Sequence, residues 1–187
     1  MGRWEPDGRG RLEQAALELF GERGFENTTV AQIAARAGLA ERTFFRYFAD
    51  KREVLFWGAQ ALQELMVEAL VDTPPSAAPL AAVAAALDAA GTVLQDRLEI
   101  ARHRHGVIVA SAELRERELI KLASLAAALG DALRLRGTDG TTATLAAEAG
   151  IAVFRVAFER WVTDTAPQDL AQLIRESLEE LRGVTAG

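Results

Sequence analysis

Apolar residues recur along most of the chain at the three-to-four-residue spacing of a helix with one buried face. In residues 12–20, LEQAALELF, this spacing is followed by Leu12, Ala15, Ala16, Leu19 and Phe20. No stretch alternates apolar and polar residues for long enough to predict a strand. The pattern therefore predicts an all-α protein.

Residues that end and begin helices divide the N-terminal part into three short helices. Gly24 and Gly38 suit the left-handed conformation in which helices commonly end. Thr28 or Thr29 is placed to cap the second helix, and residues 41–48 form the third. The N-terminal part is therefore predicted to hold three helices joined by short turns.

Longer helical segments follow. Asp50, with Glu53 three residues later, predicts the start of a helix that continues to about Val71. The segment DTPPSAAP at 72–79 interrupts the pattern, because proline cannot occupy a helix interior. Further helices are predicted over residues 79–95, 98–110, 112–136, 142–163 and 167–182, the last with Pro167 in its first turn.

Residues 29–48 have the spacing of a helix-turn-helix motif. Residues 38–40, GLA, form a three-residue turn between the two helices. On the second helix Phe44 and Phe48 lie four residues apart, so they share one face and are expected in the core. The second helix of such a motif enters the major groove of DNA.

The other side chains of this second helix combine positive charge with aromatic groups. Arginine can bind guanine through two hydrogen bonds, and threonine and phenylalanine can contact the methyl group of thymine. Hydroxyl and ammonium groups nearby are placed for phosphate oxygens. The candidate DNA-binding residues are Thr29, Arg42, Thr43, Phe45, Arg46, Tyr47 and Lys51. For Arg42 taken alone, a solvated surface arginine is the commoner case.

The segment from about Arg9 to Leu55 resembles the DNA-binding domain of the tetracycline-repressor (TetR) family. The resemblance is carried by ALELFGERGFENTTVAQIAARAGLAERTFFRYFADKREVL and extends over its whole length. It implies DNA contacts by Thr29, Arg42, Thr43, Phe45, Tyr47 and Lys51. The FFRYF sequence is similar to that of a subgroup which includes regulators of mycofactocin systems.

Two residues depart from the family pattern. Many members have serine or threonine where Ala40 stands, and the missing cap costs about 1 kcal/mol of helix stability. Glu41 offsets part of this cost, because a negative charge stabilises a helix N-terminus. Many members have tyrosine where Phe45 stands, so a hydroxyl contact is lost at that position.

Residues 1–51 are predicted to be a DNA-binding domain, and residues 52–187 a ligand-binding and dimerisation domain. The resemblance implies that the last two helices form a four-helix bundle across the twofold axis of a homodimer. The helix at 142–163 is apolar on more than one face, which fits a core contact plus a subunit contact. One large monomeric core is the alternative. The candidate dimer residues are Ile151, Trp161, Leu170, Ile174 and Leu178.

A pocket for a small-molecule effector is implied in the larger domain by the same resemblance. Such pockets are mostly apolar with a few polar groups. The candidate lining residues are Trp57, Leu87, Leu94, Ile108, Phe154, Arg155 and Phe158. Arg155 could bind a ligand carboxylate or phosphate, although a salt bridge or a solvent-directed side chain is the commoner role. An acyl-type effector is implied by the subgroup alone.

The net charge of −6 by itself argues against a nucleic-acid partner, but the charge is unevenly distributed. Residues 1–52 carry nine basic and eight acidic side chains, so the excess of acid lies in the rest of the chain. The chain has no cysteine, which excludes disulfides and cysteine-bound zinc. No signal peptide or membrane span is expected, and the predicted location is cytoplasmic.

No catalytic or metal-binding motif is recognisable in the sequence. His103 and His105 are two residues apart on a predicted helix, so they point in different directions and form no metal pair. A solvated or helix-linking role is expected for them, with sensing of ligand or pH as the alternative. Arg3, Arg9 and Arg11 precede the first predicted helix, either as an arm in the minor groove or as a solvated tail.

The sequence therefore predicts a ligand-responsive transcriptional regulator rather than an enzyme, with no metal and no cofactor. As a homodimer it would bind a pseudo-palindromic operator in double-stranded DNA. As a repressor it would leave that operator when a small apolar or acyl-type effector binds. A ligand-independent DNA-binding regulator or an activator is the alternative.

Overall fold

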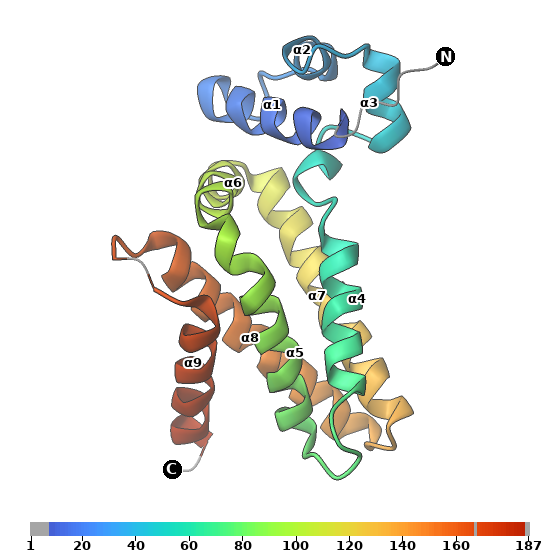
Figure 1. Cartoon of the computed structure of the whole chain (residues 1–187), viewed down its shortest axis with the longest axis vertical. Helices are drawn as coiled ribbons and strands as arrows, with labels where there is room; N and C mark the ends of the chain where they lie inside the picture. The colour runs from blue at the N-terminus through green and yellow to red at the C-terminus, as the bar shows by residue number, and fades with distance from the viewer. Residues whose placement is uncertain (1–7, 167, 186–187) are drawn as a thin grey trace. The chain divides into compact units, whose positions relative to one another are not determined.

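The computed structural model describes residues 8–166 and 168–185, and all regular secondary structure among them is helical. Its elements in chain order are α1 (Gly8–Arg23), α2 (Val30–Arg36), α3 (Glu41–Tyr47), the 3₁₀ helix η1 (Glu53–Leu55), α4 (Ala59–Val71), α5 (Pro79–Leu94), the 3₁₀ helix η2 (Gln95–Arg97), α6 (Leu98–Ala110), α7 (Ala112–Leu135), α8 (Gly140–Thr163) and α9 (Leu170–Thr185) (Figure 1). The predicted all-α fold is confirmed.

Most helix ends lie where the sequence places them. Gly24 and Gly38 have φ angles of 83° and 67°, so both adopt the left-handed conformation that follows α1 and α2. Thr29 is the residue that caps α2. The last helix begins at Leu170 in the structure, and Pro167 lies outside the described residues.

The continuous helix predicted from about residue 51 to Val71 is wrong. Asp50 does cap the turn that follows, through two backbone N–H groups at 2.8 and 3.3 Å. Only the short helix η1 comes next, and α4 begins at Ala59. The three successive side chains at 54–56 are at most 5% exposed, which a straight helix with one buried face does not allow.

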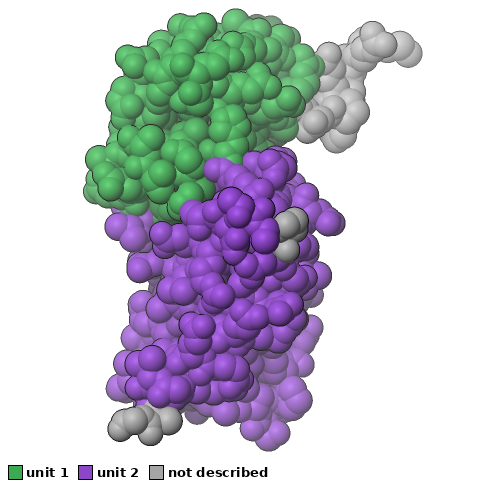
Figure 2. Space-filling view, turned by 90° about the vertical axis from the view of Figure 1, so that its left-hand side faces the viewer, with its two compact units in different colours: residues 1–58, 103–118 green, residues 59–102, 119–187 purple. Residues whose placement is uncertain are grey.

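The chain divides into two compact units, which Figure 2 colours separately. Unit 1 contains residues 1–58 and 103–118, and unit 2 contains residues 59–102 and 119–187. The division passes through α6 and α7, so each of these helices contributes one end to each unit.

Unit 1 has its own hydrophobic core between α1, α2, α3 and the adjoining ends of α6 and α7. Phe44 and Phe48 are 0% and 4% exposed, which confirms their predicted place in the core. Their rings lie 5.2 Å apart between centroids, within the range of favourable aromatic contact. This core attaches α3 to the unit by one face and leaves its other face exposed.

Unit 2 is organised around α5, which packs against α4, α8 and α9. Close helix approach depends on glycine at two crossings. A Cβ atom at Gly150 would lie 2.3 Å from the side chain of Val83, and one at Gly91 would lie 3.0 Å from the backbone of Ala171. The α5–α8 and α5–α9 contacts are therefore closer than larger residues would permit.

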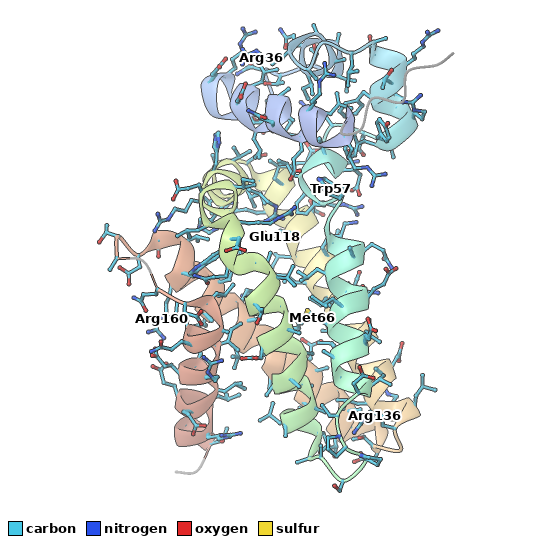
Figure 3. All side chains as sticks on the ribbon, viewed as in Figure 1. Arg36, Trp57, Met66, Glu118, Arg136 and Arg160 are labelled. Carbon is cyan, nitrogen blue, oxygen red and sulfur yellow. The ribbon has the colours of Figure 1, made fainter. Side chains whose placement is uncertain are left out.

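Arg136, at the end of α7, holds the turn that follows α4 (Figure 3). Its guanidinium donates hydrogen bonds to the backbone oxygens of Leu70, Val71, Thr73 and Pro74. Leu70 and Val71 are the last residues of α4, where carbonyl groups lack donors within the helix. The Thr73 hydroxyl also donates to the Leu70 oxygen at 2.8 Å, so two side chains stabilise the proline-containing break.

Two helical stretches in the described part of the chain are long and apolar enough to cross a membrane by length and composition alone. They are Glu53–Val71, which includes η1 and α4, and Gly140–Thr163, which is α8. In α8 the apolar side chains include many that pack into the core of unit 2, such as Ala157 and Trp161. A core helix of this kind has the same composition as a membrane span, so the finding is weak evidence for a membrane.

Candidate nucleic-acid interface

The helix before α3 is fixed at its start by a reciprocal pair of hydrogen bonds. The Thr29 hydroxyl accepts a bond from the Gln32 backbone N–H at 3.2 Å, and the Gln32 side-chain oxygen accepts one from the Thr29 N–H at 2.9 Å. This capping box sets where α2 begins. The exposed Thr29 hydroxyl retains its own proton, which is the proton that a phosphate oxygen would accept.

The α3 helix presents two different faces. Phe44 is fully buried, whereas the next residue, Phe45, is 54% exposed. Arg42 and Arg46 are exposed, and Thr43 and Tyr47 are half-buried. The structure thus exposes Arg42, Phe45 and Arg46, while Thr43 and Tyr47 lie at the edge of this face and Tyr47 also packs against the unit 1 core. At its start Ala40 makes no side-chain hydrogen bond, as expected for alanine at this position.

Arg46 and Tyr47 contact each other on this surface. The Arg46 guanidinium donates a hydrogen bond to the Tyr47 hydroxyl oxygen at 3.1 Å. The same guanidinium lies 4.9 Å from the centroid of the Tyr47 ring, which is within cation–π range. The two side chains therefore form one surface group.

Lys51 is engaged within unit 1. Its ammonium group donates to the backbone oxygens of Phe25 and Thr28, at 2.7 and 3.2 Å. It also lies 4.1 Å from the centroid of the Phe25 ring. These contacts hold the loop between α1 and α2 and use two of the three ammonium protons. The predicted phosphate contact of Lys51 stays a prediction, with one proton left for it.

An ion-pair cluster joins α2 to α1 on the surface of unit 1. Arg36, labelled in Figure 3, lies 3.1 Å from a carboxylate oxygen of Glu18 and 3.0 Å from one of Glu22. Hydrogen bonds to the Glu22 and Glu18 carboxylates raise the pKa of Arg36. The hydrogen bond between Arg36 and Glu22 also lowers the pKa of Glu22. Exposed pairs contribute little stability, so this cluster adds only a small amount to the contact between α1 and α2.

The α6–α7 tip, residues 103–118, completes unit 1. Its apolar residues Ile108 and Leu114 are both 0% exposed and belong to the unit 1 core. Three polar contacts add to this packing: Ser111 to Glu26 at 2.9 Å, Arg117 to Glu53 at 2.7 Å and Arg52 to Glu113 at 3.2 Å. Nothing in the periodicity of these residues indicates which core they join, so the sequence alone does not assign the tip to unit 1.

Arg104 connects the α6–α7 tip to η1 and to Phe56, the residue that follows it. Its guanidinium donates to the Leu55 backbone oxygen at 2.8 Å and to a carboxylate oxygen of Glu118 at 3.1 Å. It also lies 4.9 Å from the centroid of the Phe56 ring. Burial lowers the pKa of Arg104, and the Glu118 carboxylate acts in the opposite direction. An arginine starts from so high a pKa that it remains charged here.

The candidate pocket residues are distributed over both units. Four of them belong to the unit 2 core or pack against it: Leu87, Leu94, Phe154 and Phe158. Ile108 belongs to the unit 1 core and Trp57 packs against that core. Arg155 is exposed.

The candidate dimer residues lie in the core of their own subunit. Trp161, Leu170 and Ile174 are at most 1% exposed, and Ile151 and Leu178 are 6% and 4% exposed. Side chains this deeply buried have little surface to give to a second subunit. Their assignment to a dimer contact stays a prediction, and other residues of α8 and α9 carry the exposed surface.

The histidines and the N-terminal arginines lie as follows. The His103 imidazole is next to Gly21, where an added Cβ would be 2.6 Å from Nε2. Within the described ranges no three His, Asp or Glu side chains are grouped to hold a metal ion. Arg9 and Arg11 lie inside α1, so neither belongs to an arm or tail, and Arg3 lies outside the described residues. Arg11 donates to the Ala37 backbone oxygen at the end of α2.

Two family models match successive regions of the chain. A model described as bacterial regulatory proteins of the tetR family matches residues 13–56. A model described as the MftR C-terminal domain matches residues 77–186. Together they cover most of α1, all of α2 and α3, and most of unit 2, with the α6–α7 tip inside the second match.

Curated relatives match over different lengths. The HTH-type transcriptional regulator TcmR of Streptomyces glaucescens is 42% identical over 92 residues, which are 49% of this chain and 41% of TcmR. The chain thus spans less than half of that relative. A Mycobacterium tuberculosis protein named as the mycofactocin biosynthesis regulator MftR is 31% identical over 159 residues, which are 82% of this chain and 79% of that protein.

Solved structures share the fold at low sequence identity. FadR from Bacillus subtilis, solved with stearoyl-CoA, has a TM-score of 0.60 and 22% identity over 92% of this chain and 96% of its own. The SmeT–triclosan complex has a TM-score of 0.66 and 21% identity over 94% of this chain and 91% of SmeT.

Proposed function

Because the chain belongs to the TetR family of bacterial transcriptional regulators, with a C-terminal domain of the MftR type, we propose that it is a homodimeric repressor. Binding of a small-molecule effector releases the repressor from its operator. In this proposal residues 1–51 bind the DNA, and residues 52–187 bind the effector and the second subunit. The α6–α7 tip is the exception, since it folds with the DNA-binding part.

The observation that supports DNA binding most strongly is the division of α3 into two faces. Phe44 and Phe48 anchor the helix, so Arg42, Phe45 and Arg46 stay exposed. Exposing a large aromatic side chain costs free energy unless a partner covers it. Two guanidinium groups beside that ring suit guanine edges and phosphates, and the ring itself suits a thymine methyl group. Double-stranded DNA offers guanine edges, phosphates and thymine methyl groups together, so it is the partner that fits both guanidinium groups and the ring.

Replacing Arg42 by alanine is expected to weaken binding to DNA flanking the protein's own gene by about tenfold or more, because a guanine contact contributes about 1–3 kcal/mol. Arg182→Ala is the matched control, since Arg182 is an exposed arginine on α9. Fluorescence anisotropy with labelled fragments would measure both. Equal affinities of Arg42→Ala and wild type would refute the assignment of this face. The same titration gives the stoichiometry, for which two protomers per site are expected.

An apolar stripe on α8 supports the homodimer. Leu145 and Val156 are 65% and 47% exposed and lie 11 residues apart, which is close to three helical turns. The small, exposed residue Ala152 lies between them on the same face. Contact with the same stripe of a second copy would remove these side chains from water. We assign the dimer contact to this stripe in place of the buried candidates.

Two buried polar atoms in unit 2 support an effector site. Within the described residues, the Trp161 indole N–H and the Ser177 hydroxyl are buried without a hydrogen-bond partner. An unpaired buried donor costs about 1–3 kcal/mol, so it calls for an explanation. Trp161 continues an aromatic row with Phe154 and Phe158, whose neighbouring ring centroids lie 5.9 and 5.6 Å apart. An apolar molecule with one hydrogen-bond acceptor would satisfy the indole N–H.

The acceptor is expected to be uncharged. Among the described residues of unit 2, no lysine, arginine or histidine side chain is buried, so no buried cation would neutralise a carboxylate. An acyl chain ending in an ester or thioester carbonyl meets this requirement. Two relatives in fold, FadR and SmeT, were solved with stearoyl-CoA and with triclosan.

Methyl decanoate is therefore expected to bind more tightly than decanoate, which carries a charge at the same chain length. Trp161→Phe should weaken methyl decanoate binding about tenfold, because it removes one hydrogen bond and keeps a ring in the core. Trp57→Phe is the matched control in unit 1. Isothermal titration would measure all three proteins. Tighter binding of decanoate, or unchanged affinity in Trp161→Phe, would contradict this effector class.

Release requires that the effector bind the DNA-free conformation better than the DNA-bound one. The interruption before Ala59 removes the long continuous helix that would have served as a rigid lever. The helices that pass through the division between the units are α6 and α7, and we assign transmission to them.

A further inference from the structure

Arg9 contacts two aromatic rings from separate segments of unit 1. Its guanidinium carbon lies 5.4 Å from the centroid of the Tyr47 ring and 5.3 Å from that of Trp57. Arg9 is in the first turn of α1, Tyr47 is the last residue of α3, and Trp57 follows η1. Figure 3 labels Trp57 in the segment between η1 and α4. Both distances are within cation–π range.

The Tyr47 ring has further neighbours that limit its movement. Arg46 contacts the ring and donates a hydrogen bond to its hydroxyl oxygen. The start of α1 lies against it, since a Cβ atom at Gly8 would be 3.5 Å from both Cε2 and the hydroxyl oxygen. A phenol hydroxyl that accepts one bond still has its own proton to donate. Its neighbours thus hold the ring in place, and that proton is available to a phosphate oxygen.

We propose that Arg9 is a positioning residue, which holds the Tyr47 hydroxyl in the orientation that binds DNA, and that Trp57 holds Arg9 in turn. We name Arg9, Tyr47 and Trp57 the clasp. Arginine suits this role because its planar guanidinium stacks on aromatic faces while remaining charged. The proposal rests on DNA binding by α3. It also gives Trp57 a role in DNA binding, in place of the pocket role expected from the sequence.

The clasp has a consequence for regulation, because of where Trp57 lies. Trp57 precedes Gly58, the residue at which the first segment of unit 1 ends. A change of backbone conformation at this exit moves the indole ring, and through Arg9 it changes the support of Tyr47. The last turn of α3 is therefore coupled to the exit of the chain from unit 1 by side chains alone.

The alternative role for Arg9 is direct contact with a DNA phosphate. It predicts a different salt dependence of binding and a different dependence on the residue at position 47. A lost phosphate contact lowers the salt slope of binding by about one for each bound protomer, and it weakens binding whatever stands at position 47. A lost positioning contact leaves the slope unchanged and has an effect only while the Tyr47 hydroxyl is present. The two roles are separable in a double-mutant cycle.

The test is a cycle of wild type, Arg9→Gln, Tyr47→Phe and the double variant, with DNA affinity measured at several salt concentrations. Arg9→Gln is expected to weaken binding about two- to fivefold for each bound protomer, the factor that one exposed cation–π contact supplies. In the Tyr47→Phe background it should have no further effect, and the salt slope should stay that of wild type. Additive losses, or a slope lowered by about one for each bound protomer, would overturn the positioning role.

A measurement without DNA separates the clasp from the proposed function. The chain has three tryptophans, so the ¹H–¹⁵N spectrum contains three indole resonances, which Trp→Phe variants assign. Arg9→Gln is expected to shift the Trp57 resonance and to leave that of Trp161, in unit 2, in place. An unchanged Trp57 resonance would disprove the clasp whatever happens to DNA affinity. Failure of wild type to bind DNA would disprove the proposed function, and the role of Arg9 with it, even if the resonance shifts.

Discussion

Phe44→Ala is expected to destabilise unit 1 by about 3–5 kcal/mol and to abolish DNA binding at physiological temperature. The side chain is fully buried, and its ring contacts those of Phe45 and Phe48 at centroid distances of 5.6 and 5.2 Å. Removing the ring leaves a cavity where α3 is attached to the core. Because a domain has only about 5–15 kcal/mol of total stability, a loss of this size removes a large fraction of it and takes away the anchor that positions α3.

Phe45→Ala is the matched control for this prediction, since it removes the same ring from the neighbouring position. Phe45 is 54% exposed, so its loss should cost about 1 kcal/mol or less while weakening DNA binding. Urea unfolding with hydrogen exchange of α1–α3 peptides would measure both variants. If the two substitutions cost equal stability, the division of α3 into a core face and a DNA face is wrong.

Ile108→Ala is expected to destabilise unit 1 by about 2–5 kcal/mol, although residue 108 lies far along the chain from α3. Ile108 is 0% exposed and belongs to the same core as Phe44. Hydrogen exchange should therefore increase in α1 and η1, which the α6–α7 tip contacts. This is the opposite of what its predicted role in an effector pocket implies, since a pocket residue would alter unit 2.

Val109→Ala provides the control, since Val109 is the next residue and is 49% exposed. It is expected to change stability by about 0.5 kcal/mol or less. Exchange measured peptide by peptide would place the effect of each variant in unit 1 or unit 2. Faster exchange confined to α8 and α9 in Ile108→Ala would show that this side chain supports unit 2 instead.

The Phe44 and Phe45 variants test a placement that follows from the sequence, whereas the Ile108 and Val109 variants test a placement that only the tertiary structure gives. The face of Phe44 follows from its spacing to Phe48, because a helix turns about 100° per residue and brings residues four apart together. The core that Ile108 joins follows from no local pattern. Its neighbours are apolar at helical spacing, and that spacing indicates only that one face of the helix is buried.

Capping shows the same distinction at the level of single side chains. The Thr29 cap and the left-handed conformations of Gly24 and Gly38 depend on backbone groups within a few residues, so the sequence predicted them. Lys51 behaves otherwise. Its acceptors, at Phe25 and Thr28, lie more than 20 residues away, and only the packing of unit 1 brings them within 3.2 Å.

The sequence by itself determined the helical class, most helix boundaries and the two faces of α3, because these depend on periodicity and on local hydrogen bonding. The tertiary structure alone decided which core receives the α6–α7 tip, why the helix after Asp50 stops, and which rings hold Arg9. It also placed the five dimer candidates in their own core. Each of these depends on contacts between residues distant in the chain, and an apolar side chain packs equally well against any partner of suitable shape.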